Sequence, residues 1–347
     1  MNISEKNIEL LRTLLEKDKE QKIVILSHTN PDGDAIGSSL AWARVLRSAG
    51  NYSVSCIVPN RYPYFLSWME GIDELINYKD QTEKVSEAVA QADIIFCLDF
   101  NALSRLEGLS DVIAENKTAK RVLIDHHLEP DQNYDIMFSF PNASSTCFIV
   151  YSLIEQMWGT DLVNRSIGEL LYVGMMTDTG NFSFSFLTPA LYRSLAVLVE
   201  KGIDIQNINS QVYNSFSEDR ARLFAYTIDR KMSIIKNGTV AYMALTEREM
   251  RRYNFQQGDS EGFVNYPLSI KKMKFSVIFI EHRKFIRISF RSRKHIDVNL
   301  FARKYFEGGG HKNAAGGKSY RSMEQTIAHF LTSIDEFARE GGLDDEQ

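Results

Sequence analysis

The sequence predicts an α/β fold: a mainly parallel sheet with helices on both faces, followed by a smaller α+β domain. In the first half of the chain, apolar runs of strand length alternate with helical stretches, which is typical of parallel βαβ units. In the last third, apolar runs pair across short polar turns, which is typical of hairpins. A chain of 347 residues suits two domains. We expect these at residues 1–203 and 231–347, joined by a helical linker at 204–230.

The first domain is expected to be built from apolar strands that end in polar residues. "KIVILS" (22–27) predicts a buried strand, and a helix should follow from about Ala35 to Ala49. The later elements are strands at 52–58, 93–99 and 121–125, a helix over "EKVSEAVA", and helices near 146–157 and 167–177. In parallel sheets, ligands bind beyond the carboxyl ends of the strands. The polar residues that follow each strand are therefore the candidates for a site.

The second domain is expected to contain two hairpins and two helices. "KMSIIKNGTVAYMAL" should turn at Asn237-Gly238, and "KFSVIFIEHRKFIRISFRS" near His282-Arg283. A helix around 298–306 leads into the glycine-rich segment "GGGHKNAAGG" (308–317), and an amphipathic helix covers Met323 to Arg339. These elements predict a compact α+β domain.

Composition indicates a soluble, cytoplasmic protein with no membrane partner. We find no signal peptide, and the longest apolar runs have the length of strands, too short to cross a bilayer. The three cysteines, Cys56, Cys97 and Cys147, each lie in an apolar run and have no metal-type spacing. We expect all three to be buried free thiols.

Charge is unevenly distributed along the chain. The formal net charge is −5, yet Lys271 to Arg321 contains fourteen Lys and Arg residues and three acidic residues, a net charge of +11. An acidic body with a basic segment suggests that the basic part binds an anionic ligand. A solubilising basic face is the alternative.

Histidine and aspartate follow the ends of apolar segments at four places. The residues are His28, Asp32 and Asp34 after "KIVILS", Asp99 at the end of "DIIFCLD", Asp125, His126 and His127 after "RVLI", and Asp178 in "GMMTDTGNF". Taken singly, each has an ordinary explanation: a turn, a helix N-cap or an exposed loop. In a parallel sheet, however, the ends of neighbouring strands lie on one edge. We therefore expect these groups to converge.

Several carboxylates in one pocket repel each other unless they take up protons or cations lie between them. Mixed imidazole and carboxylate ligands suit a divalent ion, Mn²⁺ first, with Mg²⁺, Co²⁺ or Zn²⁺ as alternatives. The ligands are too many for one ion. Two ions about 3.5–4 Å apart, bridged by one carboxylate, would use them all.

The glycine-rich segment predicts an anion-binding loop, in which bare backbone N–H groups approach a phosphate. His311 and Lys312 add donors, and Arg291 and Arg293 alternate on one face of the strand "SFRSR". Arginine suits bidentate binding of phosphate. The alternatives are a flexible turn before the last helix and the solvent side of a strand.

Taken in order, H-x-x-x-D-x-D, then D, then D-H-H, then D resembles the DHH phosphoesterase superfamily, and "GGGHKNAAGG" resembles the signature of its associated C-terminal domain. The resemblance spans nearly the whole chain, and all the metal motifs are intact. In layout the chain is similar to bacterial phosphodiesterases that degrade nano-RNA and also remove the 3′-phosphate from pAp (adenosine 3′,5′-bisphosphate). The resemblance also allows a homodimer.

The resemblance implies a role for each matching residue. His28, Asp32 and Asp99 would hold one Mn²⁺, and Asp34, Asp99, His126 and Asp178 the other, with Asp99 bridging. Asp125 would fix a histidine, and His127 would contact the scissile phosphate and protonate the leaving group. The phosphate and terminal nucleotide of the substrate would be held by Arg291, Ser292, Gly309, Gly310, His311 and Asn313.

These expectations predict a two-metal hydrolase that acts on short oligoribonucleotides, on pAp, or on both, with its active site in the cleft between the domains. A clamp on one terminal nucleotide suits short substrates better than long strands. Three alternatives remain open: a pyrophosphatase of the same superfamily, a phosphodiesterase for linear or cyclic dinucleotides such as pApA or c-di-AMP, and a non-catalytic nucleotide sensor. The glycine-rich segment disfavours the first, and the intact ligand set disfavours the last.

Overall fold

The computed structural model describes residues 1–347 apart from residues 2, 18–19, 184–185 and 344–347. It divides the chain into two compact units, Met1–Ser215 and Phe216–Gln347. The division falls inside the segment 204–230, which contains α8 (Ile205–Tyr213) in the first unit and α9 (Glu218–Tyr226) in the second. Each unit has its own sheet and cores, described separately below.

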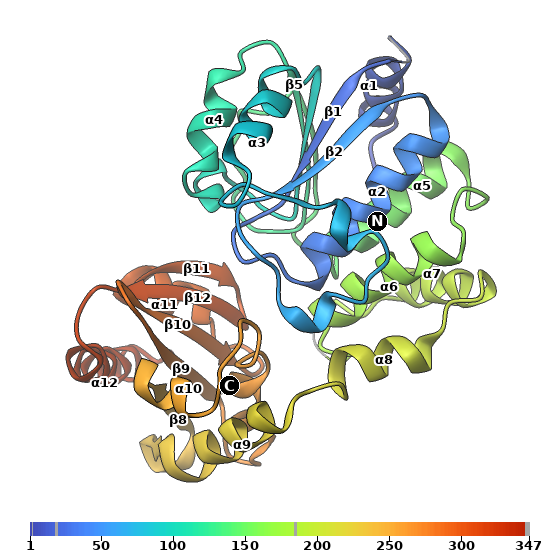
Figure 1. Ribbon diagram of the computed structural model, residues 1–347. Coiled ribbons are helices and arrows are strands. Elements are labelled where there is room, and N and C mark those ends of the chain that lie inside the picture. The colour runs from blue at the N-terminus through green and yellow to red at the C-terminus, as the bar shows by residue number, and fades with distance from the viewer. Residues whose placement is uncertain (2, 18–19, 184–185, 344–347) are drawn as a thin grey trace. The chain divides into compact units, whose positions relative to one another are not determined.

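The first unit is built on a six-stranded parallel sheet, as predicted (Figure 1). In sheet order its strands are β3 (Ile76–Asn77), β2 (Ser53–Val58), β1 (Lys22–Leu26), β4 (Ile94–Leu98), β5 (Lys120–Asp125) and β6 (Ile136–Ser139). The order runs in one direction from β1 to β3 and in the other from β4 to β6. The loops that follow β1 and β4 therefore diverge at the carboxyl edge of the sheet, which is where ligands bind in sheets of this kind.

Helices cover both faces of this sheet because its strands are apolar on both sides. In β1, Ile23 and Ile25 belong to one core, and Val24 and Leu26 to the other. The first core takes in α1 (Glu5–Glu16), α2 (Gly33–Ala49), α5 (Thr146–Trp158), α6 (Arg165–Asp178), α7 (Pro189–Glu200) and α8. The second core takes in α3 (Thr82–Ala90) and α4 (Leu109–Glu115). This is the layered arrangement that near-continuous apolar strands require.

The second unit is built on a six-stranded mixed sheet. In sheet order its strands are β11 (Glu307–His311), β12 (Ala314–Ser319), β10 (Phe285–Ser292), β9 (Phe275–His282), β8 (Val240–Leu245) and β7 (Met232–Ile235). The pair β8–β9 is parallel and the other pairs are antiparallel. Both predicted hairpins, β7–β8 and β9–β10, are present.

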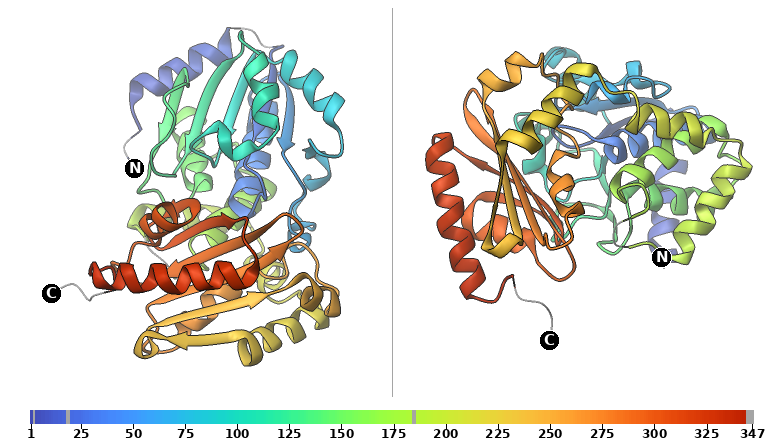
Figure 2. Two further views of the ribbon diagram at one scale, coloured as in Figure 1. Left: turned by 90° about the vertical axis from the view of Figure 1, so that its left-hand side faces the viewer. Right: turned by 90° about the horizontal axis from the view of Figure 1, so that it is seen from below.

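Helices also cover both faces of the second sheet. α11 (Val298–Tyr305) and α12 (Met323–Arg339) pack on one face, where Phe275, Phe290 and Phe330 are fully buried. Figure 2 shows α12, the long red helix, along that face. α9 and α10 (Glu247–Arg252) pack on the other face.

The expectation of a loop at residues 308–317 is wrong, because the glycine-rich segment forms the hairpin β11–β12 with its turn at Lys312-Asn313. Close approach of the two strands explains the glycines. A Cβ on Gly308 would lie 2.1 Å from the carbonyl oxygen of Gly316. Glycine is unfavourable in most strands, but here the backbones come so close that a side chain would not fit.

The structure bears on the expectations for the three cysteines and for membrane-spanning helices. Cys56, Cys97 and Cys147 are buried free thiols, as predicted. Within the described residues, no helix combines the length and the apolar character that a membrane span needs.

Candidate metal centre

The predicted site residues of the first unit converge at the carboxyl edge of the parallel sheet. His28, Asp32 and Asp34 follow β1, Asp99 follows β4, and Asp125 and His126 end or follow β5. β1, β4 and β5 are adjacent in the sheet, so their ends meet. Asp178 is the last residue of α6, which packs on α2. Residues spread over 150 positions of sequence are thereby brought to one place.

One group of potential ligands consists of His28, Asp32 and Asp99, whose ligand atoms all lie within 4.8 Å of one another. His28 Nε2 is 3.4 Å from Asp99 Oδ2. Its Nδ1 is 2.9 Å from the carbonyl oxygen of Thr29. A carbonyl oxygen can only accept, so Nδ1 carries the proton and Nε2 is left to bind a metal.

A second group consists of Asp34, Asp99 and His126, again with ligand atoms within 4.8 Å of one another. His126 Nε2 lies 3.8 Å from Asp34 Oδ2, 3.5 Å from Asp99 Oδ1 and 3.3 Å from Asp178 Oδ2. The ring's Nδ1 faces the carbonyl oxygen of Ala143 at 3.3 Å. Asp99 belongs to both groups, which is the arrangement that a bridging carboxylate requires.

Asp34 is held by the first turn of α5. Its carboxylate is almost fully buried and accepts hydrogen bonds from the N–H groups of Thr146, at 2.6 Å, and Cys147, at 2.8 Å. Unpaired N–H groups at a helix N-terminus favour an anion. Thr146 also donates its hydroxyl to Asp99 Oδ1 at 3.0 Å. Thr146 is not among the residues predicted from the sequence, although its position beside the N-cap Ser145 is a signal for this role.

Close helix packing brings Asp178 to the same place. α6 approaches α2 and α5 at Gly174, where a Cβ would lie 2.2 Å from Cys147 Sγ and 2.7 Å from Asp34 Oδ1. A larger residue would push α6 away and carry Asp178 with it. Gly174 is therefore required for the assembly of the site.

The backbone at Asp99 is in the left-handed region, with φ 64°. A non-glycine residue in this region costs roughly 1–2 kcal/mol, and aspartate tolerates it better than most. This conformation turns the side chain of Asp99 between the two ligand groups, at the point where β4 ends.

The pKa values of these side chains depend strongly on the charges of their neighbours. Burial, with the charges of Asp99 and Asp178, raises the pKa of Asp34 well above its ordinary value. Burial alone would raise the pKa of Asp99, but hydrogen bonds from His126 and His28 lower it well below its ordinary value. The pKa of His126 is raised despite burial, first by Asp178 and then by Asp99. Positive charge is thus needed at this edge, and the donor set of imidazole nitrogens and carboxylate oxygens fits divalent cations.

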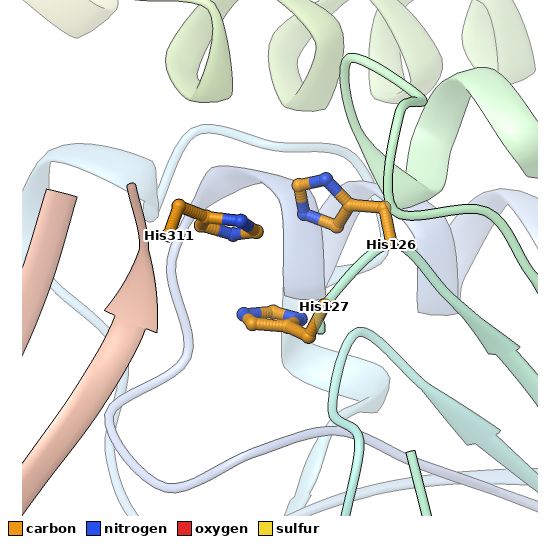
Figure 3. Close-up of side chains that lie close together, drawn as sticks. All are labelled: His126, His127 and His311. Carbon is orange, nitrogen blue, oxygen red and sulfur yellow. The ribbon is translucent and has the colours of Figure 1, made fainter. Parts of the chain in front are cut away.

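Asp125 and His127 form a hydrogen-bonded pair that adjoins the cluster, because His127 Nδ1 also lies 3.9 Å from Asp99 Oδ1. Asp125 Oδ1 is 2.7 Å from His127 Nδ1, and Asp125 is fully buried. Figure 3 shows His127 next to His126 after β5; the centres of the two rings are 5.0 Å apart. Because Nδ1 donates to Asp125, His127 presents Nε2 for other chemistry.

Arg105 is a second residue that our sequence analysis did not single out. It lies in a short helical turn, Leu103–Leu106, whose Arg105 carbonyl oxygen accepts from the N–H of Thr29 at 3.0 Å. Burial lowers the pKa of His28, but Asp99 and Asp32 raise it more, so the pKa lies above its ordinary value; the charge of Arg105 opposes that rise. The signal was an arginine in the loop that follows Asp99.

In the second unit, the predicted substrate residues lie at one end of the sheet, but four of them make internal hydrogen bonds, among them Arg291, whose Nη1 donates to the carbonyl oxygen of Phe290 at 2.9 Å. Asn313 Nδ2 donates to Ser292 Oγ, and to the carbonyl oxygens of Lys294 and Ile296, at 2.9, 3.1 and 3.2 Å. The hydroxyl of Ser292 donates to Ile296 O at 2.6 Å. The N–H of Gly310 donates to Asn299 Oδ1 at 2.9 Å. Contacts of Arg291, Ser292, Gly309, Gly310, His311 and Asn313 with a substrate stay a prediction.

Comparison with known proteins agrees with this geometry. Residues 22–175 match the DHH family, N-terminal domain, and residues 237–340 match the DHHA1 domain. A crystal structure of an exopolyphosphatase-related protein from Bacteroides fragilis is 39% identical, covers 96% of this chain and 97% of that one, and superposes with a TM-score of 0.90. The chain belongs to the DHH family.

Two curated relatives within the DHH family have informative names. The bifunctional oligoribonuclease and PAP phosphatase NrnA of Thermus thermophilus is 28% identical over 342 residues, which is 96% of this chain and 97% of that protein. The cyclic-di-AMP phosphodiesterase GdpP of Bacillus subtilis is 24% identical over 341 residues, which is 94% of this chain and 49% of that protein. This chain spans about half the length of the second relative.

Proposed function

We propose that this DHH family protein is a metal-dependent phosphoesterase that hydrolyses phosphate esters of short oligoribonucleotides and of small nucleotides such as pAp. The observation that carries the proposal is the pair of ligand groups that share Asp99. A shared carboxylate between two groups is typical of two-metal phosphoesterases.

The number of carboxylates in the site supports the binding of two metal ions rather than one. The four carboxylates of Asp32, Asp34, Asp99 and Asp178 carry four negative charges, which two divalent cations would neutralise. His28, Asp32 and Asp99 would hold one ion, and Asp34, Asp99, His126 and Asp178 would hold the other. Mn²⁺ suits the mixed nitrogen and oxygen ligands best, with Mg²⁺ or Co²⁺ as alternatives.

A bound metal pair supplies a hydroxide-forming site and neutralises the charge that develops on phosphorus. The chain itself would supply the proton. His127, held through Nδ1 by Asp125, would contact the scissile phosphate through Nε2 and protonate the leaving oxygen. Asp125 keeps the ring in one tautomer and one orientation, which such a proton transfer needs.

The substrate class is supported by the NrnA relative, which covers nearly the whole chain. A second candidate, hydrolysis of linear or cyclic dinucleotides such as pApA or c-di-AMP, is supported by the GdpP relative. Both reactions use the same chemistry at phosphorus, so only the substrate distinguishes them. A homodimer and a cytoplasmic location stay predictions.

The test is a rate comparison with Mn²⁺ on pAp, pApA, a five-nucleotide RNA, cyclic di-AMP and pyrophosphate. We expect turnover of pAp and of the short RNA to be fastest. Asp99→Asn should abolish turnover on every substrate while the circular dichroism spectrum is unchanged. A wild-type protein that binds Mn²⁺ and hydrolyses none of the five would favour a nucleotide sensor and would refute the proposal.

A further inference from the structure

The second unit contains a basic cavity that the proposed function does not use. It has a volume of about 300 Å³, and its cationic lining consists of Lys271, Lys272, Lys274, Arg293, Lys294 and His295. The remaining lining residues are Thr239, Met273 and Ile296, so no acidic residue lines it among the described residues. None of the predicted substrate residues lines it either.

The cavity wall is built from two segments that the backbone holds together. The N–H of Arg293 donates to the carbonyl oxygen of Lys274 at 3.0 Å, and the N–H of Lys274 donates to that of Thr239 at 2.8 Å. Asn313 and Ser292 tie down the turn 293–296 through the hydrogen bonds described above. Met273 and Ile296 are each 1% exposed and form an apolar base. The backbone that carries Lys274, Arg293 and Lys294 is thus held around a hollow before any ligand arrives.

Four of these cations differ in their pairing from several others in the same unit. Lys231 pairs with Glu249, Lys304 with Glu336 and Glu340, and Arg251 with Glu247. Within the part of the chain that the structure describes, no acidic side chain pairs with Lys271, Lys272, Arg293 or Lys294. Like charges gathered in a hollow repel each other, and an anion relieves that repulsion.

We propose that this cavity is a binding site for ligands with two or more closely spaced phosphate groups. Lysine and arginine around a hollow of this size suit phosphate oxygens, because each can donate several charge-assisted hydrogen bonds. Two sources share this chemistry: the backbone of an RNA strand and a small polyphosphate. The inference rests on charge and shape in the second unit and goes beyond the proposed function.

The experiment measures binding by calorimetry to the full-length chain in a buffer with a chelator, so that RNA is not hydrolysed. The probes are inorganic triphosphate and a five-nucleotide RNA. The test variant is Arg293→Glu/Lys294→Glu. The control is Arg248→Glu/Arg252→Glu, which makes the same change in net charge at exposed positions on α10.

We expect the test variant to weaken binding at least tenfold and the control to change it less than twofold. The salt dependence of RNA binding should also become shallower in the test variant, because fewer phosphates are neutralised. A loss with both probes identifies phosphate groups alone as the ligand. A loss with RNA only identifies the nucleic-acid backbone, and a loss with triphosphate only identifies a small polyphosphate.

Equal binding by the wild type and the test variant for both probes would overturn the proposal. An equal loss in the control would assign binding to bulk charge and would also overturn it. Unchanged circular dichroism and melting temperature exclude a folding defect. Manganese-dependent hydrolysis of bis(p-nitrophenyl) phosphate is measured separately, since its absence from the wild type would refute the proposed function and leave the binding result standing.

Discussion

The two units differ in the sign and the burial of their clustered charged side chains. In the first unit, acidic side chains are buried at the carboxyl edge of a parallel sheet, where Asp34 and Asp99 are 1% and 2% exposed. In the second unit, basic side chains such as Arg293 and Lys294 are exposed around a turn that other residues hold in place. Buried like charges need counterions for stability, whereas like charges around an open cavity still repel each other but more weakly, because water and salt screen them.

This difference separates the roles that the units can have. A cluster of buried carboxylates is costly, and the proteins that keep one use it for chemistry. An exposed basic cavity costs little and binds anions reversibly. We therefore expect substitutions in the first unit to affect turnover and metal binding, and substitutions in the second to affect ligand binding and local stability.

The largest effect is expected within the pair His126-His127. His127→Gln should lower kcat by about 10²–10⁴-fold, because a positioned proton donor contributes that much. Manganese affinity, measured by calorimetry, should not change. His126→Gln should lose both activity and manganese affinity, because its Nε2 faces three carboxylates. Loss of manganese affinity in His127→Gln would show that the two histidines act together as ligands.

The next largest effect is expected on the stability of the first unit when it binds manganese. Manganese should raise the unfolding transition of the first unit and leave that of the second unchanged. At one hundred times the dissociation constant, the gain is about 2.7 kcal/mol. Hydrogen exchange followed by mass spectrometry resolves the two units, with Asp99→Asn as the control that should show no gain. Protection that rises equally in both units would contradict the assignment of the metal to the first.

Asn313→Ala tests whether Asn313 stabilises the second unit or contacts the substrate. Removing the amide takes away a donor to Ser292 Oγ and to the carbonyl oxygen of Lys294, while the carbonyl oxygen of Ile296 keeps its hydrogen bond from Ser292. We expect the second unit to lose about 1–3 kcal/mol of stability, measured by denaturant unfolding. The neighbouring Lys312→Ala should cost little, because Lys312 bonds to Val298 only through its backbone. Unchanged stability with a raised KM would instead favour a substrate contact.

Much of the fold was predictable because its signals are local. "KIVILS" and "RVLID" became β1 and β5, and the amphipathic pattern of residues 323–339 became α12 with the same bounds. Convergence of Asp99 with His28 followed from the rule for parallel sheets. The hydrogen bond from the first turn of α5 to Asp34 could not be predicted, since Thr146 lies 112 positions further along the chain.

The prediction of a loop at the hairpin β11–β12 was wrong for a related reason. Its glycines have low strand propensity, and only the approach of Gly308 to Gly316 explains why they form strands. The short edge strand β3, with two residues, likewise depends on pairing with β2 rather than on its own sequence. Pairing between distant segments decides such cases, and local patterns do not contain it.

The smallest predicted effect is the acid sensitivity of the second unit at Glu249, a partly buried carboxylate that caps α10. Hydrogen bonds from Lys231 and the Thr246 backbone outweigh burial and lower its pKa from 4.5 to about 2. A depressed pKa stabilises the fold above the unfolded value, so this contribution should be present at pH 5 and be lost as pH falls from about 4.5 towards 2. The acid unfolding curve, followed by circular dichroism, measures it.

Glu249→Gln is the matched variant, because the side-chain oxygen of glutamine can keep the capping box with Thr246, whereas the charge that pairs with Lys231 at 2.7 Å and the acceptor for the Tyr226 hydroxyl are lost. The variant should be less stable than the wild type at pH 6, by less than about 1 kcal/mol for an ion pair of this exposure. The difference should shrink as pH falls towards 2, because the Glu249 carboxylate then takes up its proton. A difference that stays constant between pH 6 and pH 2 would assign the effect to packing rather than to charge.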